Sequence, residues 1–303
     1  MKIATRSSAL AVAQATIVAE LLGGPEGSRA ELLEVETEVT AAVNDKERFV
    51  RGVERAVLDR RAEFGVHSAK DLPGHMTAGL AIAAVPPRED PRDGWVGEAA
   101  SLDDVPQGAR IGTASLRRRA QLLAVRPDLR MVELRGNVDT RLAKLRSGEA
   151  DALVLAVAGL KRLGRESEVA FAFEVEQMVP AAGQGSLVLQ CRAGGEDGEE
   201  AGAARDHGAF RDLAAERSAV VTLEADCSSP VGIHAREIDG RLVIDGFVGL
   251  PDGSEWIRDR LEGDLGQPEA VGRELARRLI AAGAREILDR AGAGATNPNG
   301  AER

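Results

Sequence analysis

The sequence has no tyrosine, and its 303 residues include only two tryptophans, six phenylalanines and two cysteines. With 3% aromatic residues it offers few rings on which nucleic-acid bases could stack. Its pI near 5.1 gives little general attraction for a phosphate backbone. These shortages argue against a nucleic-acid-binding protein. The two cysteines, Cys191 and Cys227, lack the spacing of a zinc site, so we predict no metal and consider each as a single thiol.

Long apolar runs are also missing. The longest, Ala152–Leu160, has nine residues, whereas a membrane-spanning helix needs about 20. The apolar run near the N-terminus, Ala9–Ala13, has five residues and is shorter than the core of a secretory signal. We therefore expect a cytoplasmic protein without a membrane partner.

Positive charge is concentrated in one stretch of this acidic chain. The formal net charge is -10, yet Arg110 to Arg146 holds nine arginines and one lysine against three acids, a local balance of +7. Planar guanidinium groups suit carboxylates or phosphates better than lysine ammonium groups do. The stretch predicts a ligand with several negative charges.

Short β-like runs alternate with amphipathic helical runs, which is typical of α/β domains with largely parallel sheets. Pro86–Pro87 with the charged run Arg88–Asp93 interrupts this alternation, and Pro180–Gly185 interrupts it again. A separate set from about Phe210 predicts a third domain, with a helix to Glu224, strands at Val231–Arg236 and Arg241–Leu250, and a last helix over Pro268–Arg290. The earlier strands are predicted at Lys2–Thr5, Leu32–Val39, Phe64–His67, Leu80–Val85, Arg110–Thr113, Met131–Leu134, Ala152–Ala156 and Leu187–Cys191.

The segment GTASLRRRAQLL, Gly112–Leu123, predicts a strand end, a small-residue turn and a helix that begins near Ser115. Backbone N–H groups at a helix start favour an anion, and the Thr113 and Ser115 hydroxyls add donors. Successive helical residues point about 100° apart, so three adjacent arginines cannot all face one ligand. We assign Arg117 and Arg118 to the ligand, and a solvated helix face is the alternative.

The segment LRGNVDTRLAKL, Leu134–Leu145, repeats this logic. Arg135 lies at a strand end, Gly136 permits a tight turn and Arg141 follows inside the next helix. A surface ion pair of Arg141 with a nearby acid is the alternative. Arg6 stands in the same position after the first strand.

His67-Ser68-Ala69-Lys70-Asp71 follows another strand. A donor, a cation and an acid at the carboxyl end of a strand indicate a site, although Lys70 and Asp71 could merely cap and solvate a loop. His67 follows apolar Val66 and is interpreted as a hydrogen-bonded core residue. Cys227 lies in the polar turn ADCSSPVG, where a thiol is either nucleophilic or a chance surface group. Cys191 lies in an apolar strand and is interpreted as structural.

Eight separated segments carry a further signal: IATRSSALA, HSAKDLP, REDPRD, GTASLRRRAQL, LRGNVDTRLAKL, AVAGLKRLG, PAAGQG and CSSPVG. In order and approximate spacing they strongly resemble the hydroxymethylbilane synthase family, also called the porphobilinogen deaminase family, of tetrapyrrole and haem biosynthesis. The resemblance runs nearly end to end. It implies a transferase whose small-molecule partner is porphobilinogen.

In that family four porphobilinogen molecules lose ammonia and join head to tail on a covalent dipyrromethane primer, and water then releases hydroxymethylbilane. The resemblance implies that this cofactor hangs by a thioether from Cys227 and that Asp71 is the catalytic acid. Every ring brings an acetate and a propionate, which explains a cleft rich in arginine. The implied carboxylate-binding positions are Arg6, Ser8, Lys46, Ser68, Lys70, Thr113, Ser115, Arg117, Arg118, Arg135, Gly136, Arg141, Arg162 and Gln184.

The fold implied has two hinge-linked α/β domains like type II periplasmic binding proteins, plus a small α+β C-terminal domain that carries the cysteine loop. The expected boundaries are 1–86 with 183–204 for the first domain, 87–182 for the second and 205–303 for the third, with a flexible tail from about 291. We expect a monomer.

Two departures from the family pattern matter. The region Asn44–Phe49 replaces a usual Gly-Lys-Gly run, and Ala225-Asp226 replaces paired glycines before the cysteine. If those glycines supplied positive φ, the loop must bend differently, and Asp226 would disfavour a thiolate. Two alternatives therefore stay open: an inactive relative that has lost the cofactor, and a two-lobed carboxylate-binding protein that needs neither Asp71 nor Cys227.

Overall fold

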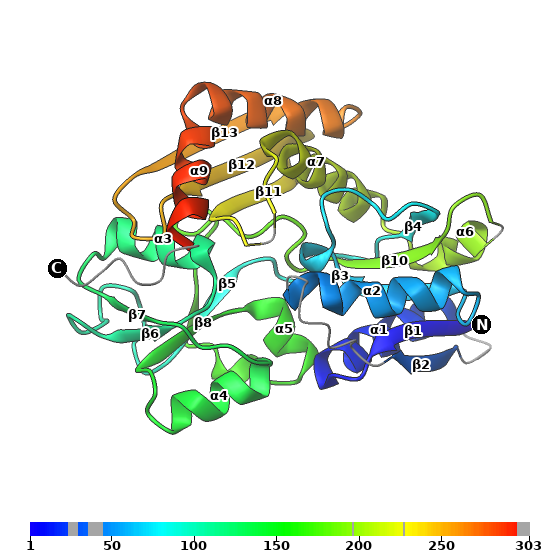
Figure 1. Ribbon diagram of the computed structural model, residues 1–303, viewed down its shortest axis with the longest axis horizontal. Helices are drawn as coiled ribbons and strands as arrows, with labels where there is room; N and C mark the ends of the chain where they lie inside the picture. Colours follow the sequence, from blue (N-terminus) through cyan, green and yellow to red (C-terminus); the bar gives the residue numbers. More distant parts are fainter. Residues whose placement is uncertain (24–29, 36–44, 196, 227, 296–303) are drawn as a thin grey trace.

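The computed structural model describes residues 1–23, 30–35, 45–195, 197–226 and 228–295, with the side chains of all but 45–49, 197, 199, 294 and 295. Three sheets organise the chain into two lobes and a third domain (Figure 1). Among the described residues, every helix is too short or too polar to span a lipid bilayer.

The first lobe is built on a five-stranded sheet of order β2-β1-β3-β10-β4. Its strands are β1 (Lys2–Arg6), β2 (Glu31–Val35), β3 (Phe64–Ser68), β4 (Leu80–Ala84) and β10 (Leu187–Arg192). β1 runs parallel to both β2 and β3, whereas β10 is antiparallel to β3 and β4.

Helices cover both faces of this sheet. Ile3 on one face packs with Ala15 and Val18 of α1 (Ala9–Gly23). Ala4 on the other face packs with residues of α2 (Asp45–Leu58). Because successive strand residues point to opposite faces, this alternation buries both sides of the sheet.

The second lobe has the same plan, with order β7-β6-β8-β5-β9. Its strands are β5 (Asp93–Val96), β6 (Arg110–Gly112), β7 (Arg130–Val132), β8 (Ala152–Ala156) and β9 (Phe171–Ala172), and its helices are α3 (Leu116–Val125), α4 (Val138–Arg146) and α5 (Val157–Arg162). β6 is parallel to β7 and β8, and β5 is the antiparallel strand.

Each lobe thus receives one antiparallel strand from a segment that crosses between the lobes. The first crossover, residues 85–92, leads from β4 into β5, and the second, residues 173–186, leads from β9 into β10. This exchange confirms the predicted pair of linked α/β lobes. The residue boundaries of the domains stay predictions.

The third domain is an antiparallel sheet of order β11-β12-β13 under helices (Figure 1). Its strands are β11 (Val231–Ile238), β12 (Arg241–Gly249) and β13 (Trp256–Gly263), and its helices are α7 (His207–Leu223), α8 (Pro268–Ala281) and α9 (Ala284–Ala295). The short α6 (Asp197–Glu200) and the 3-10 turns η1 (Ala69–Asp71), η2 (Glu166–Glu168) and η3 (Ala201–Ala204) complete the described elements. The small C-terminal α+β domain is confirmed.

Several predicted elements were wrong or missed. The single helix expected over Pro268–Arg290 is two helices, because Gly283 has a φ of 103° that ends the helical path. Where a flexible tail is expected from about 291, α9 continues to Ala295 and Ala291 is buried, and 296–303 lie outside the described residues. Sequence patterns did not indicate β5, β9 or β13. The predicted strand Leu32–Val39 is β2 as far as Val35, and 36–39 lie outside the described residues.

Candidate active site

The carboxyl ends of the parallel strands carry many of the predicted site residues. β1 ends at Arg6, β3 at Ser68 and β6 at Gly112, one residue before Thr113. β8 leads directly into α5, which ends at Arg162. Ligands of open α/β sheets bind beyond this end of the strands.

A small pocket lies at that end of the first lobe. It is lined by Arg6, Ala11, Gln14, Val50, Val66, His67, Ser68 and Asp71. The Gln14 side-chain amide donates a hydrogen bond of 2.9 Å to Ser68 Oγ. The structure therefore brings together the predicted acid Asp71 and two predicted binding residues, Arg6 and Ser68.

His67 belongs to the core rather than to the acid–base groups of this pocket. Its Nε2 lies 3.0 Å from Gln190 Oε1, and the residue is buried. Burial lowers the pKa of His67 to about 4, against the opposing effect of Gln190. The interpretation as a hydrogen-bonded core histidine is confirmed.

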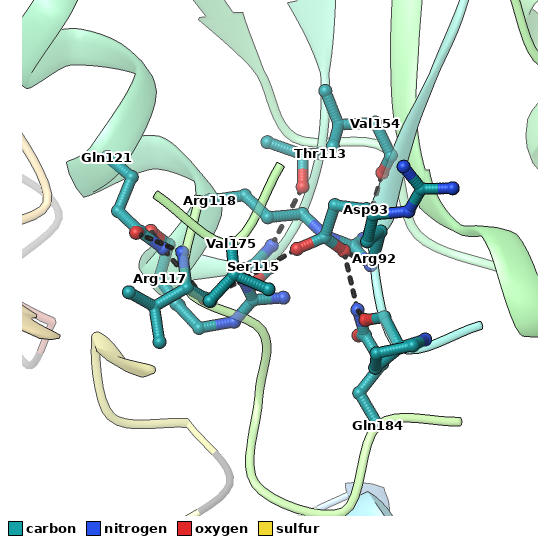
Figure 2. Close-up of polar contacts among 12 residues, drawn as sticks. Arg92, Asp93, Thr113, Ser115, Arg117, Arg118, Gln121, Val154, Val175 and Gln184 are labelled. Carbon is teal, nitrogen blue, oxygen red and sulfur yellow. Dashed lines mark hydrogen bonds and ion pairs between the residues drawn. The ribbon is translucent and has the colours of Figure 1, made fainter. Parts of the chain in front are cut away.

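A buried carboxylate organises the second lobe (Figure 2). Asp93, the first residue of β5, has no exposed surface. Arg117 Nη1 donates to its Oδ2 at 2.7 Å, and Arg118 Nε donates to its Oδ1 at 2.9 Å. Both arginines lie in the first turn of α3, so one carboxylate fixes the start of that helix.

Backbone carbonyls complete the coordination of the two guanidinium groups. Arg117 donates to the Val179 carbonyl at 2.7 Å, and Arg118 donates to the Val154 carbonyl at 2.8 Å. Arg117 is 3% exposed and Arg118 is 6% exposed. The two arginines that the sequence assigned to an anionic ligand therefore already hold one carboxylate of the chain itself.

Pairing with the two arginines keeps the buried Asp93 carboxylate ionised. Burial alone would raise the pKa of Asp93, but the positive charges of Arg117 and Arg118 outweigh it and hold the pKa well below its usual range. The three groups together carry one net positive charge.

Gln184 connects this cluster to the first lobe. Its amide nitrogen donates to Asp93 Oδ1 at 3.0 Å and to the Pro91 carbonyl at 2.7 Å. Its Oε1 lies 3.4 Å from Lys70 Nζ, within reach of that donor. The second crossover segment thus links Lys70, beside Asp71, to the arginines of α3.

The cations around this link repel one another and are partly dehydrated. Burial, assisted by the charge of Arg118, lowers the pKa of Lys70 to about 7. The pKa of Arg141 falls to about 10 through burial and repulsion from Arg118, although Asp71 partly restores it. Burial likewise lowers the pKa of Arg162 to about 10. A bound anion would relieve this excess of positive charge.

Arg141 has an unused donor. Its Nε is buried and has no hydrogen-bond partner among the described residues. Burying such a group without a partner is costly. Arg162, by contrast, donates to the Gly185 carbonyl at 2.6 Å, so it ties α5 to the second crossover segment.

Other predicted residues lie at the edge of the site or have local roles. Arg135 is exposed and pairs with Glu133 at 2.6 Å, next to Gly136, whose φ of 123° makes the tight turn. Ser8 Oγ accepts a bond of 3.3 Å from the Ala11 N–H at the start of α1. Two more lie together before α3: Thr113 Oγ1 accepts a hydrogen bond from the Ser115 N–H at 3.2 Å, and the Ser115 hydroxyl makes no cap hydrogen bond.

Two predicted residues cannot be placed. Cys227 lies outside the described residues, and so does the side chain of Lys46 in α2. The turn before Cys227 is described as far as Asp226, whose Oδ1 accepts bonds from the Ser228 N–H at 2.8 Å and from the Ser229 hydroxyl at 2.9 Å. The positive φ in this turn falls at Glu224 (56°), so Ala225 and Asp226 need no glycine conformation.

Sequence reasoning missed Asp93 and Glu216. Asp93 was assigned to the charged interruption before the second lobe, although the apolar residues that follow it could have indicated a buried strand start. Glu216 of α7 is fully buried, and its Oε1 lies 2.7 Å from Arg88 Nη1 of the first crossover. A lone glutamate in a helix gives no signal that it will be buried against an arginine 128 residues earlier.

The sequence matches two family models. Residues 1–200 match "Porphobilinogen deaminase, dipyromethane cofactor binding domain", and residues 210–281 match "Porphobilinogen deaminase, C-terminal domain". Among curated relatives, the porphobilinogen deaminase of Campylobacter curvus is 42% identical over 302 residues, covering 96% of this chain and 97% of the relative. That of Thermus thermophilus is 43% identical over 292 residues, covering 94% of this chain and 97% of the relative.

Solved structures give more distant likenesses. Immunogenic lipoprotein A from Vibrio vulnificus has a TM-score of 0.42 and 14% identity, covering 69% of this chain and 96% of its own. A TRAP periplasmic solute binding protein from Desulfovibrio salexigens has a TM-score of 0.40 and 10% identity, covering 66% of this chain and 70% of its own. These likenesses concern the fold alone.

Proposed function

Since the chain belongs to the porphobilinogen deaminase family, we propose that it is a hydroxymethylbilane synthase working through the residues described above. It condenses four porphobilinogen molecules head to tail with loss of ammonia and releases hydroxymethylbilane by hydrolysis. The observation that carries this proposal is the excess of buried positive charge around Asp71: burial and the charge of Arg118 lower the pKa of both Lys70 and Arg141, and the charge of Asp71 opposes them at both.

The donors fit the dipyrromethane group of the family. Its two rings carry acetate and propionate side chains, and the unpartnered Nε of Arg141 is one buried donor that such a carboxylate would satisfy. Arg6, Ser68 and Lys70 provide further donors at the first lobe. When bound through the sulfur of Cys227, the dipyrromethane supplies the pyrrole carbon to which the first substrate is joined.

The remaining predicted binding residues divide by their surroundings. Arg117, Arg118 and Gln184 all bind Asp93, and together with it the two arginines present one net positive charge at the start of α3. Arg162 supports the second crossover. Ser8, Lys46, Thr113, Ser115, Arg135 and Gly136 complete the proposed binding set.

The surroundings of Asp71 support its proposed role as the catalytic acid. The residue lies in the pocket with Arg6 and Ser68. Burial lowers the pKa of Lys70 and of Arg141, and the negative charge of Asp71 acts to raise it. An ionised carboxylate there would accept hydrogen bonds from pyrrole N–H groups and stabilise the positive charge that develops as ammonia leaves. The surrounding cations would hold the carboxylates of the substrate and keep its reactive carbon near Asp71.

Incubation of the purified protein with porphobilinogen tests the activity. We expect one ammonia released per porphobilinogen consumed and hydroxymethylbilane as the product. Binding of porphobilinogen without ammonia release would favour a carboxylate-binding protein instead. We propose further that the protein acts in the cytoplasm. We also propose that it is a monomer, which a measurement of its size in solution would check, and that it does not bind nucleic acid, which a binding assay would check.

The charge of Lys70 should give the reaction a pH dependence. With its pKa lowered to about 7 by burial and Arg118, Lys70 is charged below that pH and neutral above it. Its attraction for a substrate carboxylate is therefore lost as the pH rises. We expect kcat/KM to fall about tenfold or more between pH 6 and 8.5, given that a charge-assisted hydrogen bond contributes about 1.5–3 kcal/mol.

The Lys70→Arg variant is the matched control, because arginine stays charged throughout this range. Its profile should be flat where that of the wild type declines. A decline at the same pH in both proteins would assign the titration to another group.

A further inference from the structure

Two consecutive residues of helix α7 hold the segment that carries Asp71: Arg217 contacts it directly, and Glu216 acts through Gly183 of the second crossover. Glu216 Oε2 accepts a hydrogen bond of 2.6 Å from the Gly183 N–H in the second crossover, and Oε1 accepts one of 2.8 Å from the Ala235 N–H in β11. Its pairing with Arg88 adds the first crossover. One buried carboxylate therefore joins both crossovers to the third domain.

Gly183, which Glu216 binds, packs closely against the peptide just before Asp71. Its φ is 72°, and a Cβ at this position would lie 2.8 Å from the Ala69 carbonyl carbon and 2.9 Å from the Lys70 nitrogen. Only glycine fits such close contact with the Ala69–Lys70 peptide. Leu213, one turn earlier on α7, packs with Ala69 and Leu72.

Arg217 holds the other end of the segment. Its Nη2 donates to the Pro73 carbonyl at 3.0 Å and to the Gly74 carbonyl at 2.8 Å. One turn further along α7, Val221 lies close to Gly74. Contacts with α7 thus bracket Asp71: through Gly183 before it, and through Arg217 after it.

The burial of Arg217 against these carbonyls costs free energy. Burial lowers the pKa of Arg217, and no carboxylate among the described residues forms an ion pair with it. Burying a charge against neutral carbonyls, without an opposite charge beside it, is costly, so this contact is not explained by stability alone. Its neighbours Arg211 and Arg88 both have carboxylate partners.

The same helix leads to the cysteine turn. α7 ends at Leu223, and Glu224 caps it in the left-handed conformation, three residues before Cys227. A helix rises about 1.5 Å per residue, so Arg217 lies about 9 Å along α7 from its last residue. A rigid element therefore lies between the Asp71 segment and the proposed attachment point.

We propose that Arg217 is a positioning residue for catalysis, which fixes the backbone after Asp71 relative to the cofactor-bearing turn at the end of α7. The inference rests on the proposed function. Arg217 contacts neither substrate nor cofactor in this account. It acts on turnover by keeping Asp71 aligned with the pyrrole rings that Cys227 anchors.

The test compares Arg217→Ala with Arg211→Ala in the full-length holoenzyme. Arg211 is a half-buried arginine of the same helix that pairs with Asp212 and Glu237, and among the described residues it makes no hydrogen bond to 69–74. For Arg217→Ala we expect kcat to fall about tenfold to 10²-fold with KM changed less than about twofold, because small misplacements are costly in catalysis. Intact mass should show the cofactor still attached, and Arg217→Lys should recover part of kcat.

Wild-type kcat in Arg217→Ala would overturn the inference, as would an equal loss of kcat in Arg211→Ala. If Arg217→Ala does not fold, Arg217→Lys decides: reduced kcat at wild-type Tm supports positioning, and unchanged kcat contradicts it. Failure of the proposed function is separate, because it would leave the wild-type protein itself unable to consume porphobilinogen.

Discussion

Replacing Asp71 with asparagine is expected to lower kcat by about 10²-fold to 10⁴-fold, the range typical of a positioned proton-transfer group. Asparagine keeps the shape of the side chain but removes the charge that stabilises the developing cation. Asp71 is only half-buried and lines a pocket, whereas Asp93 is fully buried, so the fold should tolerate the change. Steady-state kinetics with porphobilinogen measure the effect.

The control is Asp59→Asn, which removes an exposed carboxylate of the first lobe that pairs with Arg55 at 3.8 Å. That variant should match the wild type in kcat and in thermal stability. Near wild-type turnover by Asp71→Asn would remove Asp71 from the mechanism.

The second large effect concerns stability. Asp93→Asn should lower the free energy of unfolding by about 3–5 kcal/mol, because it leaves the charges of Arg117 and Arg118 buried without their counter-ion. Urea unfolding should show a lower midpoint. The same variant should weaken porphobilinogen binding, since the guanidinium groups would lose the carboxylate that orients them.

Asp151→Asn provides the matched comparison in the same lobe. Asp151 pairs with Arg110 at 2.6 Å, but both side chains are nearly half exposed (47% and 44%). A solvated pair of this kind contributes about 0–1 kcal/mol. Equal destabilisation by the two variants would contradict the central role assigned to Asp93.

The sequence predicted the elements that have a clear repeating pattern. Alternating strands and helices indicated two α/β lobes, and the separate strands after Phe210 indicated the third domain. β5 was missed because its first residue, Asp93, closes the charged run REDPRD, which favours a loop. The break between α8 and α9 was missed because the apolar pattern continues across Gly283, and only the backbone conformation reveals the turn.

The site was predictable by residue type more than by contact. Arg117 and Arg118 were assigned to an external carboxylate, and their chemistry does suit one. Their actual partner, Asp93, is 24 residues earlier than Arg117 and lies on a strand that the sequence did not reveal. The hydrogen bonds from Arg217 to the Pro73 and Gly74 carbonyls could not be predicted either. Every residue has a backbone carbonyl, so the sequence does not show which of them an arginine contacts.

The altered turn at Ala225-Asp226 raised the question of whether the cysteine can still carry the cofactor. Positive φ falls at Glu224, so the missing glycines are not required by the described backbone. Burial would raise the pKa of Asp226, but hydrogen bonds from Ser228 and Ser229 outweigh it and hold the pKa below its usual value. Asp226, which precedes Cys227 in the sequence, therefore keeps its negative charge, and a negative charge close to a thiol disfavours the thiolate.

Intact-protein mass spectrometry of the purified protein tests the central claim most directly. The account predicts a mass higher than that of the bare chain by one dipyrromethane, and the bare mass for Cys227→Ser. A wild-type protein at the bare mass, even after incubation with porphobilinogen, would contradict covalent priming and favour a relative that binds carboxylates without turning them over.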